Sequence, residues 1–305
     1  MYDIVIVGAG PAGITAALYA ARAGKRVLLL EAESAGGQIV NARCVENYPG
    51  TPAISGVDLV DQMLLQLREL DLTPVSARVM GLRREVDGYA VLTDRETYTA
   101  KTVILATGVG HRKLGVEGEA AFIGRGVSFC ATCDGRFFKG RDVAVVGGGN
   151  TAAQDALSLA ELCRKVYLIH RRADFRAERR LMDRVRALEN VEIITDTAVC
   201  EIKGDFALQA VVLRNLKTEQ TRELAVSGVF EAVGNLPRNT DFESFVTLDK
   251  EGYILTDDEC RTSTEGIFAA GDCCQKAVRQ LTTATADGTV AALAACRYLE
   301  EQSFS

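Results

Sequence analysis

The segment Asp3-Ile4-Val5-Ile6-Val7-Gly8-Ala9-Gly10-Pro11-Ala12-Gly13 lies at the start of the chain and decides its fold. The continuous apolar run is typical of a strand that is buried on both faces of a parallel sheet. The glycines predict a tight turn into a helix: the first permits the turn, the second lets the backbone approach a pyrophosphate, and the third lets the helix pack on the strand. The free N–H groups of the helix N-terminus favour an anion at this position.

The same pattern occurs a second time, in Asp142-Val143-Ala144-Val145-Val146-Gly147-Gly148-Gly149-Asn150-Thr151-Ala152. In each copy an alanine-rich stretch with helical periodicity follows, and then a second apolar run. The predicted helices are residues 14–23 and 152–162, and the predicted second strands are residues 26–30 and 165–169. Strand, glycine turn, helix and strand in this order are a specific signature of a dinucleotide site. The sequence therefore predicts an α/β protein with two Rossmann-like dinucleotide-binding domains.

Two further apolar segments indicate how the domains are arranged along the chain. Residues 103–108 and 266–272 each read as a buried strand that ends in small residues, and residues 281–299 read as an alanine-rich helix. A strand that ends in Gly-Asp suits the side of an extended cofactor, so we assign these elements to the first domain, with the second domain inserted in it. The predicted domains are residues 1–114 with 244–305, and residues 115–243.

The residue after the second strand of each unit predicts which nucleotide is bound. In the first unit this residue is Glu31, whose carboxylate can accept hydrogen bonds from a ribose hydroxyl and repels a 2′-phosphate. In the second unit it is His170, followed by Arg171, Arg172 and Arg176, and guanidinium groups suit a phosphate. We therefore assign an unphosphorylated adenosine ribose to the first site and NADP(H) to the second. The alternative is two NAD-type sites and a solvated basic helix.

Composition limits the classes of function and the location. A net charge of −6 over 305 residues argues against nucleic-acid binding as the main role. No apolar run reaches about 18 residues, so we expect no membrane-spanning helix. The first apolar run begins at Ile4 without a basic leader, and the nine cysteines are irregularly spaced. These features predict a cytoplasmic protein.

The segment Cys130-Ala131-Thr132-Cys133-Asp134 has two common interpretations, a redox pair or half of a zinc site. Zinc needs four ligands, and the chain has only two histidines, so we expect no metal. A structural disulfide is disfavoured because two intervening residues close almost no loop. Thiol–disulfide exchange needs one attacking thiolate and one resolving thiol, and Asp134 is positioned to carry a proton. Two dinucleotide sites and one dithiol predict an electron relay from nicotinamide to flavin to disulfide.

These motifs together resemble the low-molecular-weight bacterial thioredoxin reductases over nearly the whole chain. The resemblance rests on eight segments: Gly8 to Gly13, Glu46 to Gly50, Ala106 to Gly108, Cys130 to Gly135, Gly147 to Ala152, His170 to Ala177, Ala270 to Asp272, and Arg279 with Gln280. It implies non-covalent FAD, NADPH as donor, thioredoxin as acceptor and a homodimer. It also implies that Cys133 lies nearer the flavin, that Cys130 attacks the protein substrate, that Asp134 is the acid–base residue, and that the inserted domain rotates between half-reactions.

The resemblance also implies a set of cofactor-binding residues. For FAD they are Gly8, Gly10, Pro11, Ala12, Gly13, Glu31, Gly37, Gln38, Asn47, Ala106, Thr107, Gly108, Gly271, Asp272, Arg279 and Gln280. For NADPH they are Gly147, Gly149, Asn150, Thr151, Ala152, His170, Arg171, Arg172 and Arg176. Two features depart from the family pattern: Glu231 stands where an apolar residue is usual, and Cys273-Cys274 stands where cysteine is usually absent.

Other classes of flavoprotein remain as alternatives. A ferredoxin–NADP reductase has no use for the dithiol, and relatives that take electrons from ferredoxin or oxidise dithiols with oxygen tend to lose the NADPH motifs present here. A related disulfide reductase with another donor or acceptor is a further alternative. A non-enzymatic flavin-based redox sensor would bind both nucleotides without turnover.

Overall fold

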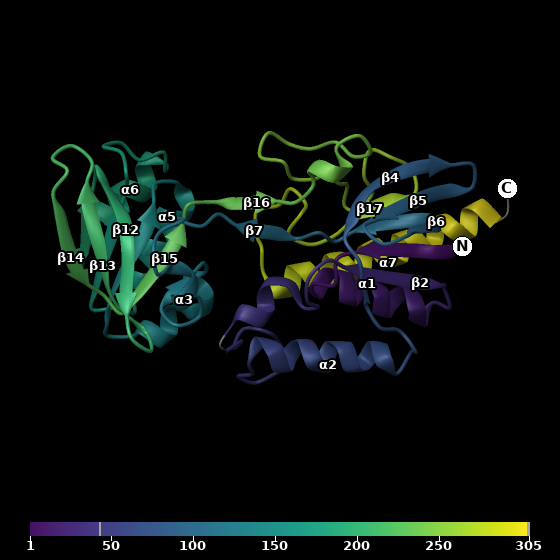
Figure 1. Ribbon diagram of the computed structural model, residues 1–305, viewed down its shortest axis with the longest axis horizontal. Coiled ribbons are helices and arrows are strands. Elements are labelled where there is room, and N and C mark those ends of the chain that lie inside the picture. The colour runs from purple at the N-terminus through teal and green to yellow at the C-terminus, as the bar shows by residue number, and fades with distance from the viewer. Residues whose placement is uncertain (43, 304–305) are drawn as a thin grey trace. The chain divides into compact units, whose positions relative to one another are not determined.

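The computed structural model describes residues 1–42 and 44–303 and divides into two compact units (Figure 1). The first unit comprises Met1–Gly110 with Leu236–Ser305, and the second comprises His111–Asn235. The sequence predicts the junctions a few residues later, after positions 114 and 243. Residues 304 and 305, at the end of the predicted first domain, lie outside the described residues. The predicted α/β class with two Rossmann-like halves is confirmed, since each unit has its own parallel sheet.

The first unit is built on a seven-stranded sheet in the order β3-β2-β1-β6-β5-β4, with β17 also paired to β6. Strands β1, β2, β3, β6 and β17 are parallel, whereas β5 pairs antiparallel with β6 and with the edge strand β4. The bounds are β1 Tyr2–Val7, β2 Val27–Glu31, β3 Val75–Ser76, β4 Val79–Glu85, β5 Gly88–Thr93, β6 Thr97–Leu105 and β17 Ile267–Ala269.

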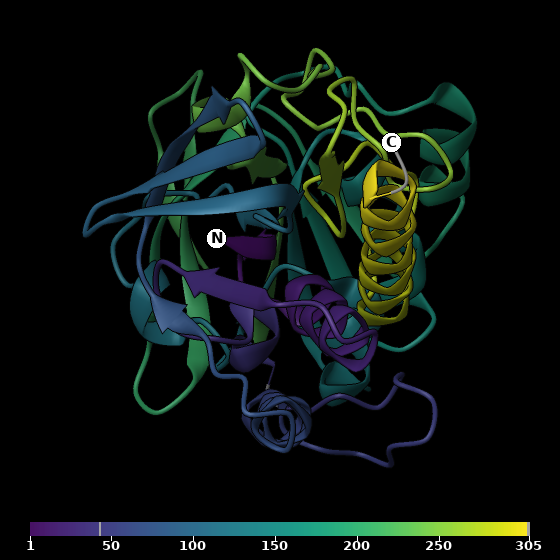
Figure 2. The same cartoon turned by 90° about the vertical axis from the view of Figure 1, so that its right-hand side faces the viewer.

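Strand β1 is buried on both faces, as its unbroken apolar run predicts. Ile4 and Ile6 pack against helices α1 (Pro11–Arg22) and α7 (Leu281–Ser303), whereas Val5 and Val7 pack on the opposite face. The two helices lie side by side, α1 in purple and α7 in yellow (Figure 2). Their approach is close, because a Cβ on Gly288 of α7 would lie 2.2 Å from the Ala12 carbonyl oxygen. The remaining helices of this unit are α2 Gly56–Arg68, η1 Gly37–Asn41 and η3 Thr240–Phe242.

The second unit has a five-stranded parallel sheet in the order β11-β10-β9-β15-β8, and a three-stranded antiparallel sheet, β12-β13-β14. Its strands are β8 Val127–Ser128, β9 Asp142–Gly147, β10 Lys165–Ile169, β11 Val191–Ile194, β12 Thr197–Gly204, β13 Leu208–Asn215, β14 Thr221–Ala225 and β15 Gly228–Ala232. The antiparallel sheet packs on one face of β9, where Ala144 and Val146 meet Val211.

Helix α5 (Asn150–Ala160) packs on the other face of β9 through its alanines and Leu159. The other helices of this unit are α3 Glu119–Phe122, α4 Ala131–Asp134, η2 Gly135–Phe138 and α6 Arg179–Arg186. The chain enters the unit along β7 (Val109–His111) and leaves it along β16 (Asn235–Pro237), and these two strands pair with each other. In the described part of the chain, no helix is long and apolar enough to cross a membrane.

Element boundaries differ from the predicted ones for local reasons. Helices α1 and α5 begin earlier than predicted, directly after the middle glycines Gly10 and Gly149, which serve as their N-caps. The strand predicted at 103–108 ends at Leu105, because the chain turns out of the sheet and Gly108 adopts a φ of +63°.

A pair of buried carboxyl groups lies in the second unit. Glu119 and Glu231 are 3% and 4% exposed. One oxygen of Glu119 accepts the N–H groups of Gly115 and Val116 at 2.6 and 3.2 Å, whereas neither oxygen of Glu231 has a hydrogen-bond partner among the described residues. Burial and then the neighbouring Glu119 carboxylate raise the pKa of Glu231 from 4.5 to about 8. Glu231 is therefore protonated at neutral pH in the folded protein.

This pair makes stability depend on pH. A carboxyl whose pKa is raised by folding stabilises the folded state fully below its unfolded pKa, and that contribution is lost as pH rises through the folded pKa. At about 1.4 kcal/mol per pH unit, the loss between pH 5 and pH 8.5 is on the order of 4 kcal/mol. We expect Glu231→Gln, which cannot ionise, to escape this loss in urea unfolding followed by circular dichroism. Glu189→Gln, at an exposed glutamate of the same unit, is the control; a parallel pH profile for wild type and Glu231→Gln would contradict the prediction.

Candidate active site

The dithiol lies at the start of the short helix α4. Cys130 is its N-cap, and Cys130 and Cys133 are joined by a disulfide with an S–S distance of 2.02 Å. The Cys130 Sγ accepts the backbone N–H of Cys133 at 3.2 Å, so the N-terminus of the helical turn points at this sulfur. Both cysteines are partly exposed, so the disulfide is accessible to a reaction partner.

Asp134 directly follows the disulfide in the chain and is half-buried. Burial raises the pKa of Asp134, and a hydrogen bond from Ser128 partly opposes the shift. The Ser128 Oγ donates to Asp134 Oδ2 at 2.6 Å and accepts the Cys130 N–H at 3.1 Å. A carboxyl group with a raised pKa next to a disulfide is suited to holding a proton and passing it to a thiolate.

Three residues near the dithiol were missed by the sequence reasoning. Ser128 joins Asp134 to the Cys130 backbone as described above. Phe129, directly before Cys130, stacks on His111 with ring centroids 4.4 Å apart and planes 2° apart. His111 Nδ1 lies 3.1 Å from Asn235 Oδ1, and burial lowers the pKa of His111, which keeps the ring neutral. The only signal for Ser128 and Phe129 was their place just before Cys130.

In the first glycine loop, two glycines are required by packing and one faces open space. A Cβ on Gly8, whose φ is +104°, would lie 2.3 Å from the Ala106 carbonyl oxygen, and one on Gly13 would lie 1.8 Å from the Gly8 oxygen. A Cβ on Gly10 would meet nothing within 4 Å. The loop therefore leaves room at the middle glycine, at the N-terminus of α1, where a pyrophosphate fits.

Glu31, at the end of β2, supports this loop. Its carboxylate accepts the N–H of Ala9 at 2.7 Å and that of Glu33 at 2.8 Å. The predicted ribose-binding residue thus also fixes the backbone next to Gly10. Gly37 is brought to the same loop, because a Cβ on it would lie 3.4 Å from the Gly10 Cα.

The other predicted residues of the first unit form two groups. Gln38 Nε2 donates to the Val109 carbonyl at 3.2 Å, close in sequence to the Ala106-Thr107-Gly108 turn, and Thr107 Oγ1 donates to Asn239 Oδ1 at 2.8 Å. Asn47 Nδ2 donates to Gln280 Oε1 at 3.2 Å, which joins two predicted residues that are far apart in the sequence.

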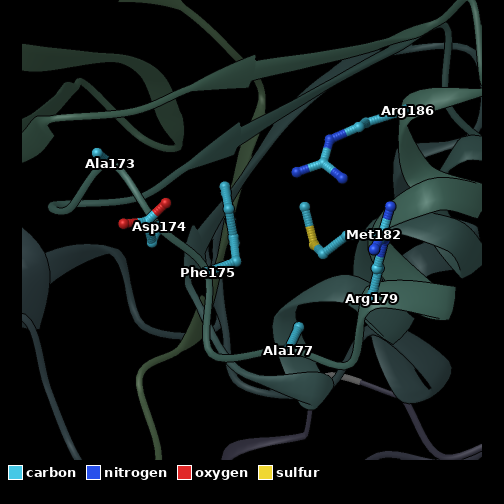
Figure 3. Close-up of a pocket in the computed structure, with 7 residues that line it drawn as sticks. All are labelled: Ala173, Asp174, Phe175, Ala177, Arg179, Met182 and Arg186. Atoms are coloured by element: carbon cyan, nitrogen blue, oxygen red, sulfur yellow. The ribbon is translucent and has the colours of Figure 1, made fainter.

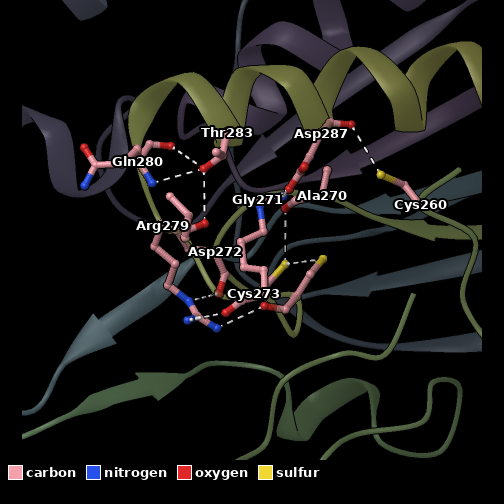
Figure 4. Close-up of polar contacts among 12 residues, drawn as sticks. Cys260, Ala270, Gly271, Asp272, Cys273, Arg279, Gln280, Thr283 and Asp287 are labelled. Carbon is pink, nitrogen blue, oxygen red and sulfur yellow. Dashed lines mark hydrogen bonds and ion pairs between the residues drawn. The ribbon is translucent and has the colours of Figure 1, made fainter. Parts of the chain in front are cut away.

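The segment after β17 carries the clearest indication of a ligand site (Figure 4). Arg279 donates to the backbone carbonyls of Asp272, Cys274 and Lys276, and Gly271 N–H donates to Asp287 at 2.9 Å. The Asp272 Oδ1 is buried without a hydrogen-bond partner among the described residues, and burial raises the pKa of this carboxyl. A buried, unsatisfied oxygen at the carboxyl end of a parallel strand is suited to accept a hydrogen bond from a polar cofactor.

The second glycine loop repeats the geometry of the first. A Cβ on Gly147 would lie 2.4 Å from the Ala232 carbonyl oxygen, whereas one on Gly149 would meet nothing within 4 Å. Asn150, the first residue of α5, exchanges hydrogen bonds with Glu178: its side chain accepts the Glu178 N–H at 2.8 Å and donates to Glu178 Oε1 at 3.1 Å. Thr151 is exposed beside it, and Ala152 is buried under the turn.

His170 has a packing role that the sequence did not show. Its ring lies against Gly148, where a Cβ would come within 2.1 Å of it, and burial lowers its pKa, as do the nearby arginines. The Gly148 carbonyl in turn accepts the N–H groups of Arg176 and Ala177 at 2.7 and 3.1 Å. The neutral imidazole thus packs against the loop at Gly148. The positive charge of this basic segment comes from the exposed Arg171, Arg172 and Arg176.

A pocket of about 290 Å³ lies beside this basic segment (Figure 3). Arg179 and Arg186 of helix α6 line it together with the ring of Phe175. The lining is completed by Ala173, Asp174, Ala177 and Met182. An aromatic ring and guanidinium groups around one hollow suit a planar base and a phosphate. Met182 and Arg186 carried no sequence signal, because they lie beyond the basic motif and only the fold of the loop brings them there.

Known proteins resemble this chain over nearly its whole length. Residues 2–288 match the family described as pyridine nucleotide-disulphide oxidoreductase. The chain is 43% identical to the thioredoxin reductase of Treponema pallidum over 98% of this chain and 97% of that protein, and 44% identical to that of Listeria monocytogenes over 99% and 95%. A crystal structure of thioredoxin reductase from Streptococcus pyogenes superimposes with a TM-score of 0.94 at 44% identity and covers 99% of both chains.

The Ser128–Asp134 hydrogen bond can be tested by titration. We expect Ser128→Ala to raise the pKa of Asp134 further, because the hydrogen bond that lowers it is lost. The measurement is the pH dependence of the Asp134 carboxyl ¹³C shift. Ser128→Thr keeps the hydroxyl and serves as the control; an unchanged Asp134 pKa in Ser128→Ala would show that Ser128 does not set it.

Proposed function

Because the chain belongs to the pyridine nucleotide-disulphide oxidoreductase family, and within it to the low-molecular-weight thioredoxin reductases, we propose a specific route for its electrons. NADPH bound at the second glycine loop is the donor, FAD bound at the first is the carrier, and the Cys130–Cys133 disulfide passes the electrons to thioredoxin. The observation that carries this route is the disulfide itself, partly exposed and next to a carboxyl group whose pKa is raised.

The residues of the first unit fit FAD. Gly10 leaves open space at the N-terminus of α1, Glu31 binds the loop backbone at Ala9, and Asp272 offers an unsatisfied buried oxygen at the end of β17. Arg279, Gln280 and Asn47 lie on or next to the segment that holds Asp272. A bound flavin supplies two-electron chemistry between a hydride donor and a disulfide. The contribution of this chain is to hold the cofactor, exclude water and present the dithiol.

The two cysteines of the dithiol have different roles in this proposal. Reduction breaks the Cys130–Cys133 bond and leaves two thiols. The Cys130 thiolate attacks the disulfide of thioredoxin and forms a mixed disulfide, and Cys133 then attacks Cys130, which restores the Cys130–Cys133 bond and releases reduced thioredoxin. Asp134 holds a proton for the thiolate at the flavin-side sulfur, which is that of Cys133. The inserted unit rotates between the half-reactions, and two copies of the chain form a homodimer; both proposals follow from the family resemblance.

An anaerobic titration tests the relay. We expect NADPH to bleach the flavin absorbance and oxidised thioredoxin to restore it. In the double variant Cys130→Ser/Cys133→Ser, bleaching should persist while recovery with thioredoxin is lost. Cys163→Ser, at a buried cysteine of the same unit, should behave like the wild type. Bleaching without recovery in the wild type would reject thioredoxin as acceptor, and no bleaching by NADPH would reject the donor.

Nucleotide selectivity tests the basic segment separately. Hydrogen bonds to a charged group contribute about 1.5–3 kcal/mol each, so loss of two such contacts costs about 100-fold or more in KM. We expect the double variant Arg172→Gln/Arg176→Gln to raise the KM for NADPH by that order and to leave the KM for NADH nearly unchanged. Arg141→Gln, at an exposed arginine before β9 in the same unit, is the control. Equal effects on both nucleotides would place the 2′-phosphate elsewhere.

A further inference from the structure

Asp287, on helix α7, is a largely buried charged residue that the electron route does not use. Its Oδ2 accepts the N–H of Gly271 at 2.9 Å (Figure 4) and also forms an ion pair with the Lys276 ammonium group. The side chains of Lys276 and Asp287 are 15% and 25% exposed, so most of this ion pair is removed from water. One carboxylate oxygen thus holds both ends of the segment 271–276, which follows β17 and contains Asp272.

The same part of α7 packs against the first glycine loop. A Cβ on Gly288, next to Asp287, would lie 2.2 Å from the Ala12 carbonyl oxygen, and a Cβ on Gly271 would lie 2.8 Å from the Ala12 Cβ. Gly271 has a φ of +85°, a conformation that glycine adopts readily. Three segments that are far apart in the sequence therefore meet at Ala12: the start of α1, the chain just after β17, and α7.

Asp272 lies between the two points at which Asp287 holds this segment. Its Oδ1 is buried and has no hydrogen-bond partner in the part of the chain that the structure describes. Burial raises the pKa of Asp272, the charges of Lys276 and Arg279 oppose this shift, and the charge of Asp287 adds to it. These charged groups therefore lie close enough to act on the Asp272 carboxyl group. Because Gly271 directly precedes Asp272, fixing the Gly271 N–H limits the directions in which the Asp272 Oδ1 can point.

A matched ion pair at the amino end of the same sheet provides a comparison. There the Asp3 carboxylate accepts the N–H of Arg26 at 2.9 Å and the Lys101 ammonium at 2.8 Å. The side chain of Lys101 is 52% exposed, against 15% for Lys276. Taking two charges out of water costs about as much as their mutual attraction returns, so a gain in stability does not account for the deeper pair. The deeper pair is the one at the carboxyl end of the sheet, beside the first glycine loop.

We propose that Asp287, held by Lys276, is a positioning residue for the flavin. This inference rests on the proposed function, in which FAD binds along the first glycine loop and the segment after β17. Asp287 fixes the turn at Gly271 and Asp272 against the glycine loop, so that the Asp272 oxygen and the loop hold one cofactor together. Asp287 acts through the Gly271 N–H and the Lys276 ammonium, and not through contact with the cofactor.

The release of FAD from the holoenzyme tests this role. The holoenzyme is diluted, and the rise in flavin fluorescence gives the dissociation rate. Loss of one hydrogen bond to a charged group corresponds to about 10- to 100-fold in an equilibrium constant, so we expect Asp287→Ala to release FAD faster by about this factor. Asp3→Ala, the control, removes the matched pair and should lower the urea midpoint without changing FAD release. Release from Asp287→Ala at the wild-type rate, or equal acceleration in Asp3→Ala, would overturn the proposal.

A second comparison does not need Asp287→Ala to fold. In Asp287→Asn the amide oxygen still accepts the Gly271 N–H, but the buried Lys276 ammonium is left without its carboxylate. The double variant Asp287→Asn/Lys276→Met keeps the same acceptor and leaves no unpaired charge. We therefore expect the double variant to release FAD more slowly than Asp287→Asn. Release from the double variant that is as fast as from Asp287→Asn, or faster, would contradict a positioning role.

The outcome for this role is separable from the outcome for the proposed function. A wild-type protein that neither contains FAD nor takes it up would reject the proposed function and, with it, the positioning role. If the wild type holds FAD and NADPH bleaches it, the FAD and NADPH sites of the proposed function stand. Equal FAD release from the wild type and from Asp287→Ala would then reject the positioning role alone.

Discussion

The rest of the structure depends on one steric constraint, the close approach of two backbone segments at the first glycine of each loop. In the first unit, a Cβ added to Gly8 would lie 2.3 Å from the Ala106 carbonyl oxygen. In the second unit, a Cβ added to Gly147 would lie 2.4 Å from the Ala232 carbonyl oxygen. This contact places β1 against β6 and β9 against β15. It also turns the chain sharply enough that the middle glycine opens onto free space at a helix N-terminus. One local feature thus sets both the sheet and the open space at the helix N-terminus.

Around these sites the protein uses burial to raise the pKa of carboxyl groups. Asp134 next to the dithiol, Asp272 at the end of β17 and Glu231 at the end of β15 all have pKa values raised mainly by burial. A carboxyl group that keeps its proton is able to donate a hydrogen bond or pass the proton on, which an exposed carboxylate at neutral pH does not do. Asp134 lies next to the dithiol, where the proposed electron route needs a group that can pass on a proton.

The chain carries two pairs of thiols whose chemistry differs because of their backbone spacing. Cys130 and Cys133 are separated by two residues in a helical turn, and their Cα atoms are 5.3 Å apart, within the usual range for a disulfide. Cys273 and Cys274 are adjacent, which disfavours the same bond. The first pair is partly exposed and forms a disulfide, whereas the second is buried with its sulfurs in contact but unbonded.

The sequence by itself determined the class of fold, the order of the elements, the glycine loops and the dithiol, because each depends on residues close together in the chain. An apolar run followed by Gly8 to Gly13 allows few structures other than strand, turn and helix. The tertiary structure alone decided which distant residues meet: Asn47 with Gln280, Phe129 with His111, Glu119 with Glu231, and the His170 ring under Gly148. It also decided which polar atoms are buried away from solvent, as is the Asp272 Oδ1. Burial and contact across many residues follow from how the sheets and helices pack, and no local pattern in the sequence encodes them.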